Sequence, residues 1–526
     1  MTRYPICWPI VPMLVAWCTL GTLSAAAQES TPASIPVSTQ TPSAPATLAG
    51  EWRDDIDAFV ARVVDAGLVP GLSVAVSQDD WVLYSAGYGS ADLASGRRVG
   101  EETRFYIASS TKALTATAVV LLAHRGELAL DAPVTRYLPS LRLTPPLDAS
   151  TIRLRDLLTL SHGIDDEGSV VFRTAYTGDF TPELLIELLA DHKPAKSGRA
   201  FKYGNLGYNI LGLVLEATGE GSWKEIVARE VLEPLGMRQT TAYVSRLDTQ
   251  QIALPHRFEP DGRFRRVPLG KADENMHAAG GHFATAGDLA RFVAVHASGG
   301  RLARRQVFPR EPIERSHELH VEQDVDWREI HRFGWGFGWD LGTWEDKTLL
   351  HRFGTFTGYR PHMSFLPEQG LGVVVLVNGL GPAFYAVDLI AFYIYDRLLG
   401  TPDVEAKYAA KLADLVAETR RMQERFAGQM EQRRARQGPL RHPLEAYAGI
   451  YESRSLGRME WRVVAGGLEV RMGVAAARAE VYDAAEDQLR VELTGGGSVV
   501  DFEFGPAGGP ARALTFDGET LTRVDG

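Results

Sequence analysis

The sequence predicts an α+β fold, an antiparallel sheet flanked by helices, followed by a small C-terminal β-barrel-like domain. Three observations predict it. Residues 51–400 alternate between helical and strand-like segments without an internal repeat, which is typical of helices that cover a sheet. Residues 402–437 are charged and helical in pattern, with a thin apolar stripe. After Pro439 the chain changes to short alternating runs separated by Gly and Asp turns, which indicates a curled sheet or small barrel.

The composition favours a large folded protein that acts on small or polar molecules. The 526 residues are 45% hydrophobic and 23% charged, which allows a sizeable core and more than one domain. The net charge is −11 and no basic block occurs. Because phosphate binding needs clustered Lys and Arg, a nucleic-acid partner is disfavoured. A small-molecule or peptide substrate is expected, and the sequence does not indicate an oligomeric state.

The N-terminus has the pattern of a secretory signal peptide. Arg3 supplies a positive start, a long apolar run follows, and small residues end near Ala27. We therefore expect a periplasmic or secreted protein. A lipid anchor at Cys18 is disfavoured by the bulky Trp17 before it. Membrane association is expected only if the segment is retained as an anchor, for which its apolar run is long enough.

Cysteine chemistry is excluded by the positions of the two cysteines. Cys7 and Cys18 both lie in the predicted signal peptide, so the processed chain would hold no thiol. No disulfide, thiolate nucleophile or cysteine-ligated metal is then available. Any chemistry must use oxygen or nitrogen groups.

The segments of the main domain are identified by their periodicity. Residues 51–67 have apolar positions at helical spacing, and residues 71–89 form two β-rich runs around a polar turn, a hairpin. Residues 362–378 indicate two more strands, and residues 383–400 a long buried helix. The chain is accordingly divided into a signal peptide, a Pro/Ser/Thr-rich linker, a main domain, a charged helical connector and a C-terminal β domain, at residues 1–27, 28–50, 51–400, 401–439 and 440–526.

The first candidate for chemistry is the segment ASSTKALTATAVVLL. Ser109 and Ser110 precede an apolar helix, so one interpretation is helix capping. The other is that Ser109 and Lys112 lie one turn apart on one face, close enough for proton transfer. A serine hydroxyl needs a neighbouring base to become a good nucleophile. Burial and the positive end of the helix would both lower the pKa of Lys112 and leave its amine neutral.

Two later segments could complete such a site. Tyr203 and Asn205 flank Gly204 just before an apolar helix, where they either begin a helix or supply a phenol that relays protons and an amide that positions Lys112. The segment HRFGTFTGYRPHMSF, which starts at His351, carries glycines that let a strand edge approach a developing oxyanion.

Taken together, these motifs resemble those of the serine β-lactamase and penicillin-binding-protein superfamily. The similarity is greatest to its class C β-lactamase-like branch of D-alanyl-D-alanine carboxypeptidases, D-aminopeptidases and esterases. Ser109 to Lys112 match S-x-x-K, Tyr203 to Asn205 match Y-x-N, and the region of Arg352, Phe353 and Gly354 matches K/H-x-G. Four connecting segments also resemble family landmarks: GELALDAPVTRYLP, IRLRDLLTLSHGI, EPLGMRQT and AAGGHFATAGDLARF.

The resemblance covers residues 51–400 and implies a fold, a mechanism and roles. The fold would be β-lactamase/transpeptidase-like, with an all-helical subdomain beside the sheet. Ser109 would form an acyl-enzyme, Lys112 and Tyr203 would share acid and base duties, and Asn205 would hold the network. The backbone N–H groups of Ser109 and Thr355 would bind the oxyanion. No metal and no organic cofactor is implied, and the C-terminal domain resembles the lipocalin-like domains of many relatives.

The third motif departs from the family pattern. Register places Arg352 where relatives carry Lys or His, with His351 one residue earlier. Adjacent strand residues face opposite ways, so only one of the two is expected to face the cleft, and register favours Arg352. Arginine is not a base, so it would bind a carboxylate or stabilise charge. The lack of K-T-G disfavours efficient β-lactam hydrolysis.

One further motif gives weaker evidence of function. HELH at 317–320 lacks the HExxH spacing of a zinc site, and a solvated loop is expected instead. The predicted function is therefore a serine hydrolase acting through an acyl-enzyme on a peptide, ester or amide. Two alternatives stay open: a β-lactamase or cell-wall D,D-carboxypeptidase, and a catalytically weak envelope binding protein.

Overall fold

The computed structural model describes residues 51–526 except 167, 437, 495, 507 and 525–526, and the chain divides into two compact units. Within the described residues, the larger unit runs from Glu51 to Gln432 and the smaller one from Arg433 onward. The predicted signal peptide and linker lie outside the described residues. No helix in the described part of the chain is long and apolar enough to cross a bilayer.

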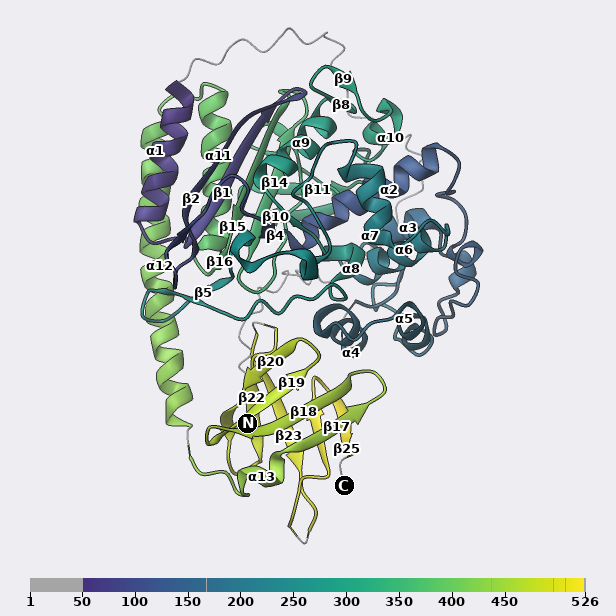
Figure 1. The fold of residues 1–526 in the computed structure, drawn as a ribbon, viewed down its shortest axis with the longest axis vertical. Helices are drawn as coiled ribbons and strands as arrows, with labels where there is room; N and C mark the ends of the chain where they lie inside the picture. Colours follow the sequence, from purple (N-terminus) through teal and green to yellow (C-terminus); the bar gives the residue numbers. More distant parts are fainter. Residues whose placement is uncertain (1–50, 167, 437, 495, 507, 525–526) are drawn as a thin grey trace, which may run out of the picture. The chain divides into compact units, whose positions relative to one another are not determined.

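A nine-stranded antiparallel sheet forms the centre of the larger unit (Figure 1). Its order is β10-β11-β12-β13-β14-β15-β1-β2-β3. The strands are β1 Gly71–Gln78, β2 Trp81–Asp92, β3 Arg97–Arg98, β10 Val321–Trp327, β11 Ile330–Trp335, β12 Asp340–Trp344, β13 Lys347–His351, β14 Arg360–Leu366 and β15 Leu371–Val377. The predicted hairpin at 71–89 is the β1–β2 pair, and the two strands predicted at 362–378 are the β14–β15 pair.

Helices cover both faces of this sheet. On one face α1 (Glu51–Asp65) and α11 (Ala383–Leu398) share a core with the buried valines of β1 and β15. On the other face α9 (Ala286–Ala297) packs on β1, β14 and β15. Figure 1 shows α1 and α11 on one side of the strands and α9 on the other. The central strands β14 and β15 are buried at every position, as expected for a sheet covered on both sides.

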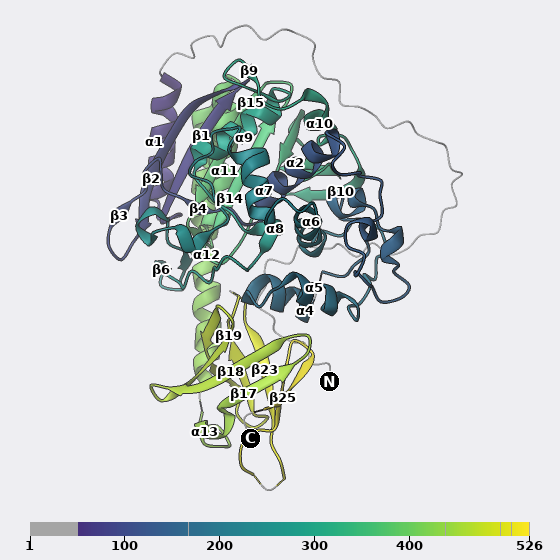
Figure 2. The same ribbon diagram turned by 45° about the vertical axis from the view of Figure 1, so that its right-hand side comes forward.

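A helical region lies beside the sheet (Figure 2). Among the described residues from Ala108 to Gln251 the regular elements are all helices. They include α2 Thr111–His124, α3 Leu154–Leu158, α4 Ser169–Val171, α5 Pro182–Leu189, α6 Leu206–Glu216 and α7 Trp223–Val227, and α8 His277–Gly280 joins them. The α2 helix is buried from Thr111 to Leu122 because its sequence is apolar on all sides. The predicted α+β fold with an all-helical subdomain is confirmed.

Short elements complete the larger unit. Strand β4 (Phe105–Tyr106) pairs with β7 (Phe283–Ala284) just before α2 begins, and β5 (His256–Phe258) lies between β6 (Phe264–Arg266) and β16 (Gly379–Leu380). The remaining pieces are β8 Arg301–Leu302, β9 Arg305–Gln306 and α10 Arg310–Arg315. The long charged helix α12 spans Val404–Ala435.

The smaller unit is a nearly closed, barrel-shaped antiparallel sheet. Its nine strands run in the order β20-β19-β18-β17-β25-β24-β23-β22-β21. They follow α13 (Leu444–Tyr447) as β17 Gly449–Ser453, β18 Gly457–Val464, β19 Gly467–Met472, β20 Ala475–Arg478, β21 Glu480–Asp483, β22 Gln488–Val491, β23 Ser498–Glu503, β24 Ala513–Phe516 and β25 Glu519–Arg523. Inward positions such as Trp461, Val470 and Phe502 are buried, which agrees with the predicted alternation.

Candidate active site

The candidate nucleophile lies at the head of the buried helix α2. A 3-10 turn, Ala108–Ser110, precedes the helix, and Ala108 has a positive φ of 44°. Ser109 is half-buried in this turn. Ser110 occupies the N-cap of α2 but makes no capping hydrogen bond through its side chain. Its hydroxyl instead donates to the backbone oxygen of Arg352 at 2.9 Å, so the capping interpretation is wrong for Ser110.

Lys112 is the polar centre of the cluster. Its Nζ lies 2.8 Å from Asn205 Oδ1, 3.0 Å from the backbone oxygen of Ala279 and 3.3 Å from Ser109 Oγ. The residue is completely buried. Burial lowers the pKa of Lys112 and the nearby charge of Arg352 lowers it further, against the opposing effects of Tyr203 and Asp166. The amine is therefore closer to neutrality than an exposed lysine would be.

The hydrogen-bond acceptors around the Lys112 amine are compatible with its neutral form. Asn205 Oδ1 and the Ala279 carbonyl oxygen only accept hydrogen bonds, and a neutral amine has two N–H groups to donate to them. In the neutral amine the remaining lone pair can accept the proton of the Ser109 hydroxyl, whose oxygen lies 3.3 Å away. This arrangement lets Lys112 accept the Ser109 proton.

Tyr203 and Asn205 reach the cluster from the start of α6. Asn205 is the N-cap residue of that helix and Tyr203 precedes it by two residues. The Tyr203 phenol hydrogen-bonds with Ser109 and with Lys112. Burial raises the pKa of Tyr203, but the charges of Arg352 and Lys112 and the hydrogen bond with Ser109 outweigh burial, so the pKa lies below its ordinary value. The structure thus brings Ser109, Lys112, Tyr203 and Asn205 together.

Asp166 supports this turn, and the sequence did not single it out. Its carboxylate accepts hydrogen bonds from the backbone N–H groups of Asn205 and Leu206, the latter at 2.6 Å. A Cβ on Gly204 would lie 2.5 Å from Asp166 Cγ, so the turn requires glycine there. Burial raises the pKa of Asp166 to about 6. Acidic side chains favour helix N-termini, but Asp166 comes from a segment distant from α6 in the sequence. That preference therefore could not have identified Asp166.

The third motif places Arg352 beside the cluster and turns His351 away. The Arg352 guanidinium carbon lies 5.0 Å from the centres of the Tyr203 and Trp335 rings, and Nη1 lies 3.2 Å from Asp340 Oδ2. His351 stacks on Phe353 at 4.2 Å and its Nε2 accepts a hydrogen bond from Arg332. Both side chains lie within 4 Å of Asp340 Oδ2, and Arg352 is the one that contacts the Tyr203 ring.

The glycine of the third motif lies against the head of α2. A Cβ on Gly354 would lie 2.5 Å from the backbone oxygen of Ile107 and 3.0 Å from the Ser109 nitrogen. Such contacts exclude any larger residue. The peptide that joins Gly354 to Thr355 is thereby held next to the backbone of Ser109, and Thr355 itself is exposed. Two backbone N–H groups near one serine are what an oxyanion hole requires.

The HELH segment is not a solvated loop, contrary to expectation. His317 Nε2 lies 2.9 Å from His296 Nδ1, and His320 stacks on Phe337 at 3.8 Å. Both histidines are half-buried because they pack on aromatic rings. Among the residues that the structure describes, no group of three His, Cys, Asp or Glu side chains is placed to hold a metal.

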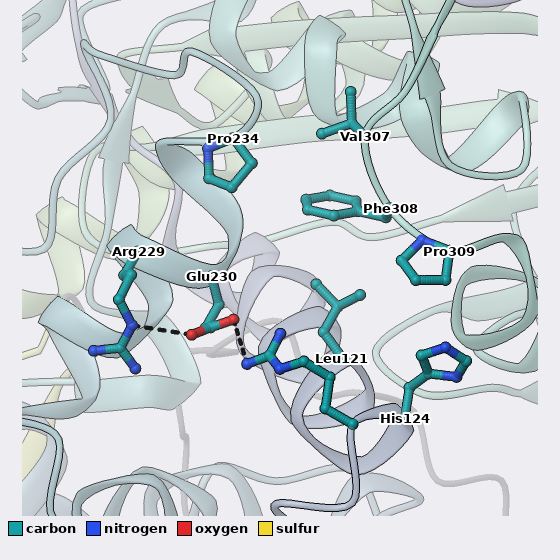
Figure 3. A pocket seen from close by; sticks show the side chains of 9 residues that line it. Leu121, His124, Arg229, Glu230, Pro234, Val307, Phe308 and Pro309 are labelled. Atoms are coloured by element: carbon teal, nitrogen blue, oxygen red, sulfur yellow. Dashed lines mark hydrogen bonds and ion pairs between the residues drawn. The ribbon is translucent and has the colours of Figure 1, made fainter.

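A separate cavity of about 220 Å³ lies at the C-terminal end of α2 (Figure 3). Leu121, Arg125, Glu230 and Phe308 are among its lining residues. Arg125 and Glu230 form an ion pair at 2.8 Å across its wall. Its lining residues include no serine, threonine or lysine, unlike the cluster at the other end of the helix.

Comparisons with known proteins agree with this geometry. A family model described as Beta-lactamase matches residues 56–394. "Protein flp" of Staphylococcus aureus (strain NCTC 8325 / PS 47) is 24% identical over 341 residues, and the match spans 63% of this chain and 64% of that protein. The chain therefore aligns with less than two thirds of this relative's length.

Two solved structures have a similar fold. The octameric penicillin-binding protein homologue from Pyrococcus abyssi has a TM-score of 0.56 and 21% identity, with 90% of this chain and 100% of that chain covered. D-amino acid amidase from Ochrobactrum anthropi SV3 has a TM-score of 0.58 and 18% identity, with 67% and 99% covered. Since the family match extends over residues 56–394, well over half of the sequence, the chain belongs to the beta-lactamase family.

Proposed function

We propose that the protein is a serine hydrolase that forms an acyl-enzyme on Ser109. The observation that carries this proposal is the environment of Lys112, whose buried Nζ has two carbonyl acceptors and the Ser109 hydroxyl around it. A base held in this way activates a serine nucleophile. The complete hydrogen-bonded cluster also favours catalysis over a role as a binding protein that has lost its activity.

The reaction follows from the positions of the groups. Ser109 Oγ attacks the substrate carbonyl carbon while its proton passes to neutral Lys112 Nζ or, when Tyr203 is ionised, to the Tyr203 oxygen. The carbonyl oxygen becomes negative and is bound by the N–H groups of Ser109 and Thr355. Collapse of this intermediate expels the leaving group, which takes up the proton. Water then attacks the acyl-enzyme, with the same groups acting as base and acid, and releases the acid product and free Ser109.

The proposed substrates are peptides, esters or amides of modest size. The amidase with a similar fold is described in complex with L-phenylalanine amide, which supports an amide among them. A β-lactamase or D,D-carboxypeptidase activity is the second candidate and is supported by the family match. The buried ion pair of Arg352 with Asp340 disfavours it, because a cation already paired is less available to a substrate carboxylate.

The proposed location is the periplasm or the cell exterior. The support is the sequence pattern of residues 1–27, a positive start followed by an apolar run and small residues.

The test uses three probes on the protein lacking residues 1–27. These are a fluorophosphonate, a fluorescent penicillin and a p-nitrophenyl ester. Ser109→Ala is compared with Ser150→Ala, which removes an exposed hydroxyl elsewhere. Ester turnover and fluorophosphonate labelling that are lost only in Ser109→Ala would support a hydrolase. Labelling by penicillin alone would favour the second candidate, and a wild-type protein that reacts with no probe would refute the proposal.

A further inference from the structure

Arg360, the first residue of β14, contacts the third motif from behind. Its Nη1 donates to the backbone oxygen of Gly354 at 2.9 Å, and the residue is only 2% exposed. Within the described part of the chain, its Nε and Nη2 make no hydrogen bond. The bond to Gly354 is therefore the main polar contact of a buried cation.

The surroundings of Arg360 hold its charge in one place. The guanidinium carbon lies 4.3 Å from the ring centre of Phe384 and 4.8 Å from that of Phe353. The nearest carboxylate, Asp388, is 3.9 Å away and belongs to α11. A buried charge is costly unless nearby groups compensate it. The hydrogen bond from the Arg360 cation therefore polarises the Gly354 carbonyl strongly.

Asp388 is fixed in turn by a buried hydrogen-bonded chain. His362 Nδ1 lies 2.8 Å from Asp388 Oδ1, and His362 Nε2 lies 2.8 Å from Ser364 Oγ. Ser364 Oγ lies 2.9 Å from the Tyr395 hydroxyl. These side chains resemble a serine–histidine–aspartate arrangement, but all are buried and no substrate reaches them. They serve to hold the carboxylate that faces Arg360.

The carbonyl that Arg360 contacts belongs to a functionally important peptide. The C=O of Gly354 and the N–H of Thr355 are parts of one planar unit and point in opposite directions. A cation that binds the oxygen fixes the plane and draws electron density from the nitrogen, which makes the N–H a better donor. The hydroxyl of Thr355 also donates to this oxygen, at 2.8 Å.

We propose that Arg360 is a positioning residue that orients and polarises the Gly354–Thr355 peptide for oxyanion binding. The inference rests on the proposed hydrolase function, since an oxyanion forms only if Ser109 attacks a carbonyl. The predicted consequence is selective: Arg360 should affect the transition state more than substrate binding.

The experiment compares Arg360→Met and Arg360→Lys with Arg328→Met in the protein lacking residues 1–27. Arg328 lies 3.9 Å from the same Asp388 carboxylate but is partly exposed and stacks on Tyr385, so its variant removes a neighbouring charge without touching Gly354. Turnover of a p-nitrophenyl ester and of its thiono analogue is measured, together with thermal unfolding. Sulfur accepts hydrogen bonds poorly, so the ratio of the two rates reports on the oxyanion hole.

Arg360→Met should lower kcat by about tenfold to a hundredfold with KM within about twofold, somewhat less than the loss of a whole oxyanion donor. The preference for the oxygen ester should shrink, and Arg360→Lys should restore part of kcat. If Arg360→Met does not fold, the rate ratio in Arg360→Lys decides, because the shorter amine reproduces the contact only in part.

Three outcomes would overturn the inference. One is an unchanged rate ratio in a folded Arg360 variant, and another is an equal loss in Arg328→Met. A wild-type protein without Ser109-dependent turnover would overturn both proposals. An active wild type together with an Arg360 variant of unchanged kinetics would overturn this one alone.

Discussion

The Arg352 guanidinium lies over the face of the Tyr203 ring, with its central carbon 5.0 Å from the ring centre. Arg352 is also paired with Asp340 and is 5% exposed. It therefore places a fixed positive charge beside Tyr203, which lowers the pKa of the phenol. Of the two roles expected for this arginine, stabilisation of charge fits its burial better than capture of a substrate carboxylate.

Replacement of Arg352 by Gln should shift the pH dependence of the enzyme. Burial raises the pKa of Tyr203 and the Arg352 charge lowers it, so removal of the charge leaves burial less opposed. The phenolate then forms at higher pH, and the limb of kcat/KM that reports Tyr203 should move to higher pH. The pH–rate profile of p-nitrophenyl ester hydrolysis measures this, with Arg352→Lys expected to lie between. A profile identical to wild type would show that Arg352 does not set the pKa of Tyr203.

Replacement of Lys112 by Ala should cut kcat/KM by at least about a hundredfold, the low end of general base catalysis. A second buried lysine provides the control. Burial lowers the pKa of Lys271 to about 7, but its Nζ bonds to the backbone oxygens of Ala272 and Asn275 and not to the serine. Lys271→Met should keep kcat/KM within about threefold of wild type. Equal losses in both variants would mean that burial of an amine, and not its contact with Ser109, is what matters.

Asp166→Asn should separate charge from hydrogen bonding. The amide oxygen still accepts the N–H of Leu206, but the negative charge that raises the pKa of Lys112 is gone. The pKa of Lys112 falls, and the acidic limb of kcat/KM should move to lower pH.

The same variant should change stability in a defined pH range. Burial raises the pKa of Asp166 to about 6 from an ordinary 3.8, so the folded state binds the proton more tightly than the unfolded chain. In wild type this favours folding increasingly as the pH falls from about 6 to 3.8, and the gain should be missing in Asp166→Asn. Urea unfolding at several pH values, with Asp165→Asn as the control, measures the difference. If Asp166→Asn retained the wild-type pH dependence of the unfolding free energy, a group other than Asp166 would bind the proton.

Gly354→Ala should lower both stability and activity. Its methyl group would lie 2.5 Å from the Ile107 oxygen and 2.9 Å from Pro361 Cγ, and overpacking of this kind costs about 1–3 kcal/mol. Gly428→Ala is the matched control, because nothing lies within 4 Å of its Cβ and it is an exposed position of α12. That substitution should stabilise the protein by about 0.5–1 kcal/mol without affecting turnover. Denaturant unfolding and ester hydrolysis test both, and a stable, active Gly354→Ala would contradict the close approach.

Local patterns predicted the parts of the fold and site that depend on local physics. The hairpin of β1 and β2, the buried helix α11 and the alternating strands of the barrel follow from periodicity and turn residues. The catalytic candidates were found because the S-x-x-K spacing alone places Ser109 and Lys112 on one helix face. Tyr203 and Asn205 were candidates from their place before an apolar helix, and the family resemblance joined them to Ser109 and Lys112.

The residues that support the site were not predictable in this way. Asp166 contacts Leu206, 40 positions away, and Asp340 and Arg360 meet Arg352 and Gly354 only because the chain turns back on itself. Each of the three is an ordinary charged residue in its own segment. The Ala279 carbonyl that fixes Lys112 has no signature at all, since every residue carries one. The HELH histidines were misjudged because polar residue types indicate exposure only on average, and these pack on Phe365 and Phe337.

The positions of the two cysteines have a practical consequence. Both precede residue 19, so residues 51–526 contain no sulfhydryl group. A single cysteine introduced at the exposed Gly428 position would be the sole attachment point for a maleimide dye or nitroxide in that part of the chain. Spectroscopic reporters can therefore be attached to this part of the protein, to follow the proposed reaction, without any prior removal of native thiols.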